Sequence, residues 1–333
     1  MNGVTLSGDP RRLITHLALY GLAAICADAG HTGLRLSWTP GMSPRPHLDI
    51  SPQIVGPIVQ AHARNRGWVK ETITLSGTAR GLMSPRLSGI PDDAGWQHLQ
   101  ARRHQVLDSL TAAGADLDLR MLGALGEPCY WRFDRKGKRL QDDAASRLEL
   151  QPRNTGAEFV GTRLNKIAQA VAARTPDQIL DGLLGDRIQD EAAGNAPDSR
   201  SATGLDAPGP ADNAVVWCAL WGISQISLAL QTTRGAAMTS ASTHPDRPEH
   251  FAVPIWRTRW HPARLRTILP SRQLTATTAA FVHGRLPEDG VRQWLTARGV
   301  TAIIIFPVTI TGSDKAPERR AGTGQLHPIG SPQ

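Results

Sequence analysis

The stretch from Asp142 to Arg174, DDAASRLELQPRNTGAEFVGTRLNKIAQAVAAR, joins a strand pattern to a helix pattern across a short turn. Apolar and polar residues alternate around Leu148, which is typical of a half-buried strand. Pro152 ends this strand because proline has no amide proton to give to a ladder. Thr155 and Glu158 have the spacing of a capping box, so we expect a helix to begin there. The stretch therefore predicts a rigid corner between a strand and a helix.

The turn at this corner carries Gln151, Arg153 and Asn154. Helix N-termini attract anions, and guanidinium and carboxamide groups make directional hydrogen bonds to phosphates and base edges. We therefore interpret the turn as a contact with nucleic acid. The alternative is a helix-capping turn whose polar side chains are simply solvated, since short motifs of this kind often have no function.

Basic residues gather on both sides of the corner. The helix after it has an apolar stripe from Phe159 to Val171, with Arg163 and Lys166 on another face. Before it, the turn Asp134–Gly137 starts the densest positive cluster of the chain, and the long loop 77–91 adds two arginines. Such charges contact phosphates or remain in water. The predicted nucleic-acid contacts are Arg80, Arg86, Arg135, Lys136, Lys138, Arg139, Arg147, Gln151, Arg153, Asn154, Arg163 and Lys166.

The composition describes a globular protein with a basic balance. The 333 residues are 40% hydrophobic and 20% charged, and a chain of this length predicts two domains. The net charge of +8 favours a polyanionic partner, namely nucleic acid, an acidic membrane surface or an acidic protein. A high-GC genome would enrich arginine together with alanine, glycine and proline, but codon bias alone does not explain 37 basic against 29 acidic residues.

The cysteines and the N-terminus favour a cytoplasmic protein. Cys26, Cys129 and Cys218 are far apart and odd in number, without the spacing of a zinc site, which fits a reducing compartment. Residues 11–27 have the outline of a signal peptide. However, His16 interrupts the apolar run, and the helical periodicity of this run favours a core helix. No segment approaches the length of a membrane span.

The order of the patterned segments predicts an α+β fold. An N-terminal basic domain, residues 1–190, contains short antiparallel strands and helices and is expected to contact nucleic acid. Residues 191–213 form a linker or surface loop, because they are rich in small and polar residues without periodicity. A smaller mixed domain follows at 214–311, with a buried strand at 301–310. We expect residues 312–333 to be a disordered tail.

Motifs of catalysis are missing from the sequence. It contains no GxxxxGK[ST], GxSxG or HExxH, and no GxGxxG after a strand. Asp142 and Asp143 are the kind of acidic pair that binds magnesium, but no third acid has supportive spacing. We therefore predict a protein that is not an enzyme, with no catalytic residue, no metal site and no cofactor.

Several segments carry a resemblance to a known family. They are LALYGLAAI at Leu17–Ile25, SRLELQPRNTGAEFVGTRL at Ser146–Leu164, WCALWGISQI at Trp217–Ile226 and FAVPIWRTRWHPARLRTIL at Phe251–Leu269. The chain resembles the large subunits of type I CRISPR interference complexes (Cascade), nearest to the divergent G-type (formerly U-type) variants. At 333 residues it is short for this family. The helical C-terminal bundle is then expected to be missing, its role falling to a separate small subunit.

The resemblance implies a non-enzymatic role in a CRISPR RNA-guided complex. Such subunits lie near the crRNA 5′ handle, recognise the protospacer-adjacent motif in double-stranded DNA, help to open the duplex and dock the nuclease-helicase. The implied partners are crRNA, target DNA, the backbone and handle-binding subunits and the nuclease-helicase. The family has no shared motif for motif-reading residues, so the contacts named above rest on the sequence alone. Two alternatives remain: a metal-dependent nuclease or RNA-processing enzyme, and an adaptor that binds only proteins.

Overall fold

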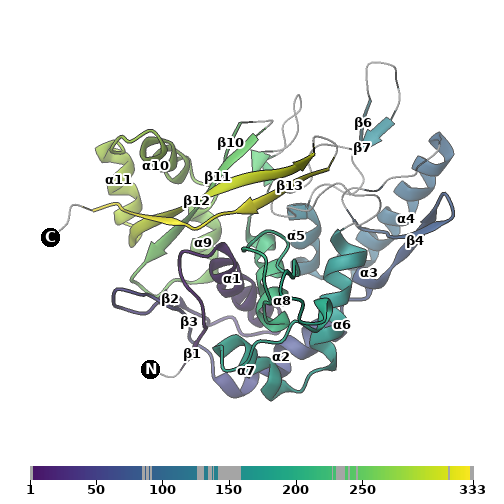
Figure 1. Cartoon of the computed structure of the whole chain (residues 1–333), viewed down its shortest axis with the longest axis horizontal. Helices are drawn as coiled ribbons and strands as arrows, with labels where there is room; N and C mark the ends of the chain where they lie inside the picture. The colour runs from purple at the N-terminus through teal and green to yellow at the C-terminus, as the bar shows by residue number, and fades with distance from the viewer. Residues whose placement is uncertain are drawn as a thin grey trace.

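The computed structural model of the chain describes residues 3–84, 87, 90, 92–125, 131–133, 137, 139–141, 159–226, 228–229, 237–238, 241–244, 247–313 and 316–330. The regular elements of these residues are helices and small antiparallel sheets (Figure 1), so the predicted α+β class is confirmed.

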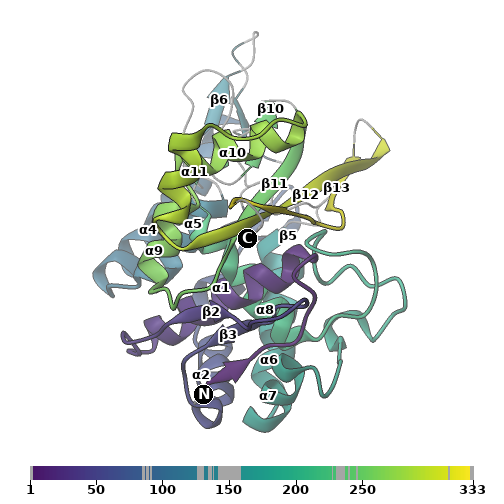
Figure 2. The ribbon, with the colours of Figure 1, turned by 90° about the vertical axis from the view of Figure 1, so that its left-hand side faces the viewer.

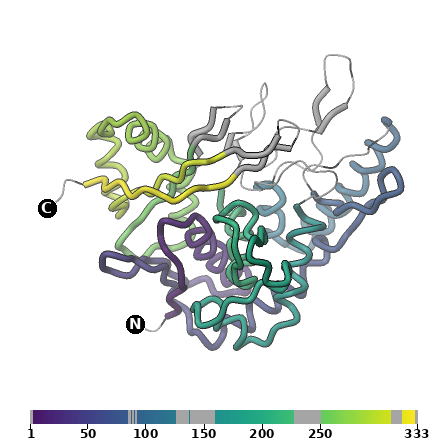
Figure 3. Tube along the Cα trace, viewed as in Figure 1, coloured from purple at the N-terminus to yellow at the C-terminus, as the bar shows by residue number. Residues whose placement is uncertain are grey.

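Two apolar helices lie at the centre of the molecule: α1 (Leu13–Asp28) and α8 (Asn213–Gly222). The Cα trace shows the two segments side by side, α1 in purple and α8 in green (Figure 3). Both are buried nearly all round, as expected for helices without a polar face. Their backbones touch, because a Cβ atom on Gly21 would overlap the carbonyl oxygen of Cys218. The pair therefore forms the middle of the core.

Further helices surround this pair. α2 begins with Pro52 in its first turn, where proline is favoured, and α7 begins with a complete capping box between Thr175 and Gln178. These helices are α2 (Pro52–Arg64), α3 (Gly67–Lys70), α4 (Asp93–Ala112), α5 (Asp116–Leu125), α6 (Asn165–Ala173) and α7 (Pro176–Leu184).

Short strands occur along the chain as far as Met238. A three-stranded antiparallel sheet has the order β1-β3-β2, in which β2 and β3 are consecutive strands. Two-stranded antiparallel pairs follow along the chain. The strands are β1 (Val4–Thr5), β2 (Leu36–Trp38), β3 (Pro46–Leu48), β4 (Thr72–Leu75), β5 (Thr78–Gly81), β6 (Trp131–Phe133), β7 (Arg139–Gln141), β8 (Leu228–Ala229) and β9 (Ala237–Met238).

The largest sheet lies near the C-terminus. Its antiparallel order is β10-β11-β12-β13, and β14 also pairs with β12. Helices α10 and α11 lie together beside β11 and β12 (Figure 2). The predicted buried strand at 301–310 is part of β12. The elements are β10 (Ala241–His244), β11 (Arg247–Trp256), α9 (Pro262–Ile268), α10 (Arg272–Val282), α11 (Asp289–Thr296), β12 (Val300–Ser313), β13 (Ala316–Ala321) and β14 (Gln325–Pro328).

Two expectations about the organisation of the chain need correction. The disordered tail is wrong for residues 316–330, because β13 and β14 extend the sheet and Ile329 is buried. The segment 191–213 does not separate two cores either. One hydrophobic cluster runs from Val4 to Ile329, since helix α8 buries its apolar surface against α1. The segment itself is a folded loop containing the short helix η3 (Glu191–Ala193).

Candidate nucleic-acid interface

The predicted basic helix begins its described part with a π-helical turn, η2 (Val160–Leu164), which continues directly into α6. π-helical turns are rare and frequently occur at functional sites. Val160 and Leu164 are fully buried, whereas Arg163 is partly exposed. The apolar residues therefore hold the turn in the core and leave the guanidinium group at the surface.

Strand β5 packs closely against this turn. The backbone of Gly81 approaches Gly161 so closely that a Cβ atom on Gly81 would lie 2.7 Å from the Gly161 nitrogen. The Val160 amide donates to the hydroxyl of Ser84, which is fully buried, at 3.2 Å. Arg80 precedes Gly81, and its Nε atom is buried with no hydrogen-bond partner in the described part of the chain. Arg80 and Arg163, two predicted contacts from distant segments, thus lie on elements that pack against each other.

A small pocket opens beside η2 and α6. Its volume is about 260 Å³, and its lining is Thr162, Arg163, Lys166, Ile167, Ala192 and Ser201. Arg163 Nη1 donates to the carbonyl oxygen of Arg200 at 3.3 Å, which ties the helix to the loop 199–206. Lys166 is exposed and has no ion-pair partner among the described residues. The pocket therefore presents two cationic side chains.

The acidic groups near the pocket already have partners. Ser201 donates its hydroxyl proton to Asp190 at 2.7 Å, and Asp190 is fully buried. Arg174 bonds Glu191 at 2.6 Å and Asp212 at 2.8 Å. Burial opposes the charge of Arg174, but the hydrogen bonds to these two carboxylates outweigh it and raise its pKa. The cationic side chains of the pocket are Arg163 and Lys166, and charged donors of this kind suit a phosphate group.

The structure places some of the predicted nucleic-acid contacts close together. Arg163 and Lys166 share the pocket, and Arg80 lies on the strand that packs against η2. Arg139 is the first residue of β7, where its backbone pairs with Phe133. The remaining predicted contacts lie outside the described residues: Arg86, Arg135, Lys136, Lys138, Arg147, Gln151, Arg153 and Asn154. Their role stays a prediction.

Sequence reasoning missed the loop that closes the pocket. Ala192 and Ser201 come from the segment expected to be a linker or surface loop. The loop is ordered by polar side chains, since Asp190 accepts hydrogen bonds from Ser199, Ser201 and Asn213. The presence of these residues in the segment was the signal in the sequence. Asp, Ser and Asn are residues that bond locally to the backbone and to each other in turns.

Three further observations concern metal ligands, membrane spans and similarity to known proteins. Among the described residues, no three His, Cys, Asp or Glu side chains gather to hold a metal ion. The helices in the same ranges are too short or too polar for any of them to cross a membrane. Comparison of the chain with protein-family models, curated proteins and solved structures gave no match.

Proposed function

We propose that this chain is a non-catalytic, nucleic-acid-binding subunit of a CRISPR RNA-guided surveillance complex. The observation that carries the proposal is the pocket of Arg163 and Lys166 beside the strand of Arg80, in a chain of net charge +8. Arginine and lysine bind phosphate oxygens whatever the base sequence, so such a surface positions a duplex without cutting it.

The proposed place in the complex follows from the resemblance to Cascade large subunits. The chain binds double-stranded DNA near the crRNA 5′ handle, recognises the protospacer-adjacent motif and docks the nuclease-helicase in the cytoplasm. In this scheme base pairing with the guide reads the target, and the protein reads a short motif and the phosphate backbone. The segment Ser146–Leu164, which carries part of the resemblance, includes η2 as its last five residues.

The salt dependence of duplex binding tests the proposal. The full chain is titrated with a fluorescent DNA duplex at several salt concentrations, with wild type compared with Arg163→Ala/Lys166→Ala. Each lost phosphate contact reduces the slope of log K against log salt by about 0.9. We therefore expect the double variant to bind more weakly and its slope to fall by about two.

The matched control is Arg272→Ala/Arg285→Ala, which removes two exposed arginines at the two ends of the α10 region. It should keep a slope near that of wild type. Equal slopes for the two double variants would contradict the assignment of a phosphate site to the pocket of Arg163 and Lys166, called the phosphate site below. Magnesium-dependent cleavage of the duplex that EDTA abolishes would contradict the non-catalytic role.

A further inference from the structure

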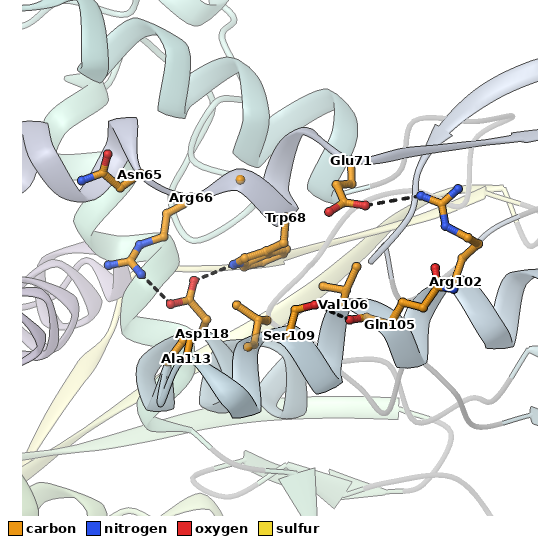
Figure 4. A pocket seen from close by; sticks show the side chains of 13 residues that line it. Asn65, Arg66, Trp68, Glu71, Arg102, Gln105, Val106, Ser109, Ala113 and Asp118 are labelled. Carbon is orange, nitrogen blue, oxygen red and sulfur yellow. Dashed lines mark hydrogen bonds and ion pairs between the residues drawn. The ribbon is translucent and has the colours of Figure 1, made fainter.

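A second and larger pocket, which shares no lining residue with the pocket of Arg163 and Lys166, lies between the end of α2 and the face of α4 (Figure 4). Its volume is about 430 Å³, within the usual size of a ligand site. One wall comes from the segment that joins α2, α3 and β4. The other follows α4 at helical spacing through Arg102, Val106, Ser109 and Ala113, and Asp118 of α5 closes the end.

The charged groups of this pocket are paired with one another. Arg66 Nη1 lies 2.5 Å from Asp118 Oδ2 and its Nη2 lies 2.7 Å from Asp28, while Arg102 lies 3.5 Å from Glu71. The lining thus holds two cationic and two anionic side chains, so its formal charge is zero although the chain carries +8. A phosphate would meet a carboxylate of like charge beside each guanidinium group. The pairing therefore selects against polyanions.

The rest of the lining is apolar or carries carboxamides, apart from Ser109, whose hydroxyl donates to the backbone carbonyl of Gln105 at 2.8 Å. Trp68 and Val106 are buried apolar walls, and Trp68 Nε1 donates to Asp118 Oδ1 at 2.5 Å, which fixes the ring. Asn65 and Gln105 are exposed, and neither carboxamide has a hydrogen-bond partner in the described part of the chain. A carboxamide offers one acceptor and two donor hydrogens, which complements a peptide unit.

We propose that this pocket binds an uncharged polypeptide segment of a partner protein. The apolar side chains of the segment pack on Trp68 and Val106, and its backbone amides pair with Asn65 and Gln105. The neutral lining excludes both nucleic acid and strongly charged peptides. This inference does not depend on the phosphate site, because the two pockets share no residue.

The test uses a phage-displayed library of random 12-residue peptides, selected on the immobilised full chain. Selected peptides are then synthesised, and their affinities are measured by fluorescence anisotropy. We expect them to be apolar and free of Asp, Glu, Lys and Arg. Ser109→Trp fills the pocket and should weaken their binding at least tenfold. His104→Trp adds the same ring to an exposed position of α4 outside the lining, and should leave binding unchanged.

A second variant tests the pocket independently of whether Ser109→Trp folds. Gln105→Glu changes an exposed side chain and makes the formal charge of the pocket negative, so it should also weaken binding of the selected peptides at least tenfold. The proposal is overturned if selection yields no common pattern, if the peptides are rich in charged residues, or if folded Ser109→Trp and Gln105→Glu bind them like wild type. It is also overturned if a single-stranded oligonucleotide binds the chain and Ser109→Trp alone abolishes that binding.

Discussion

At the scale of single residues, His16 shows how burial fixes a protonation state. The ring of His16 is fully buried on α1, with its centroid 4.6 Å from that of Trp38 and 5.7 Å from that of Phe306. Its Nε2 lies 2.7 Å from the carbonyl oxygen of Pro10, so this nitrogen carries the proton and donates. Burial lowers the pKa of His16 to about 4, although the carbonyl of Pro10 favours the charged form.

This shift predicts a loss of stability in mild acid. Above pH 6.5 the ring is neutral in both the folded and the unfolded chain, so the contribution of His16 is fully present. Below pH 6.5 the unfolded chain takes up the proton first, and the stability falls until the folded ring titrates near pH 4. The lost free energy of unfolding is about 3 kcal/mol, at about 1.4 kcal/mol per pKa unit.

Urea unfolding between pH 7 and pH 4 measures this loss. His16→Gln keeps a donor for the carbonyl of Pro10 but cannot titrate, so its stability should fall by about 3 kcal/mol less than that of wild type over this range. Burial also lowers the pKa of His62, and the nearby charge of Arg66 adds to the effect, so the variant retains part of the pH dependence. A pH profile identical to that of wild type would refute the role of His16.

The residue scale also shows what the sequence can and cannot supply. The helical spacing of Arg163 and Lys166 predicted a common face, and both line one pocket. Their neighbours across the pocket, Ala192 and Ser201, are contributed by a loop that no periodicity connects to α6. Local pattern identifies side chains on one element, but it carries no information on which distant loop packs against it.

At the scale of elements, the close contact between α1 and α8 depends on glycine. Cβ atoms at Gly21 and Gly222 would overlap the carbonyl oxygens of Cys218 and Leu17, respectively. Each helix therefore presents a backbone patch to the other at the centre of the core. Since the overlapped atoms belong to backbone, side-chain rotation cannot relieve the clash.

Gly21→Ala is expected to lower the free energy of unfolding by about 2–4 kcal/mol, because overpacking forces the two helices apart. Gly123→Ala is the matched control, since Gly123 lies within α5 and a Cβ atom there meets nothing within 4 Å. The control should be neutral or stabilising by up to about 1 kcal/mol, as alanine is the better helix former. Similar losses for both variants in chemical denaturation would show that the glycine contact is unimportant.

Elements with capping signals or clear periodicity were predictable, and others were not. Helices α2 and α7 begin at the proline signals found in the sequence. Helix α10 went unpredicted because its buried face includes threonines, and Thr278 satisfies its hydroxyl on the carbonyl of Leu274. Helix α8 ends at Gly222 although apolar residues continue after it in the sequence, and such a run does not mark where a helix stops.

At the scale of the whole molecule, the C-terminal residues close the fold. Strand β14 pairs with Ala302–Ile305 of β12, and Ile329 is 2% exposed. The Gly324 amide donates to the carbonyl oxygen of Arg11 at 2.8 Å, which ties the end of the chain to the start of α1. The segment was expected to be a disordered tail. Pairing with a distant strand leaves no local sequence pattern by which β14 could be predicted.

Deletion of residues 323–333 tests whether the C-terminal strand supports the core. The deletion removes the buried Ile329 and one of the strands that pair with β12, so burial alone predicts a loss of about 2 kcal/mol or more in the free energy of unfolding. A fall in Tm on the order of 5 °C should follow. The unpaired edge of β12 should also make the chain more prone to aggregate. Calorimetry and light scattering measure both effects against a control truncated after Gly330. If the longer deletion matches this control in Tm and solubility, the C-terminal strand contributes nothing to the core.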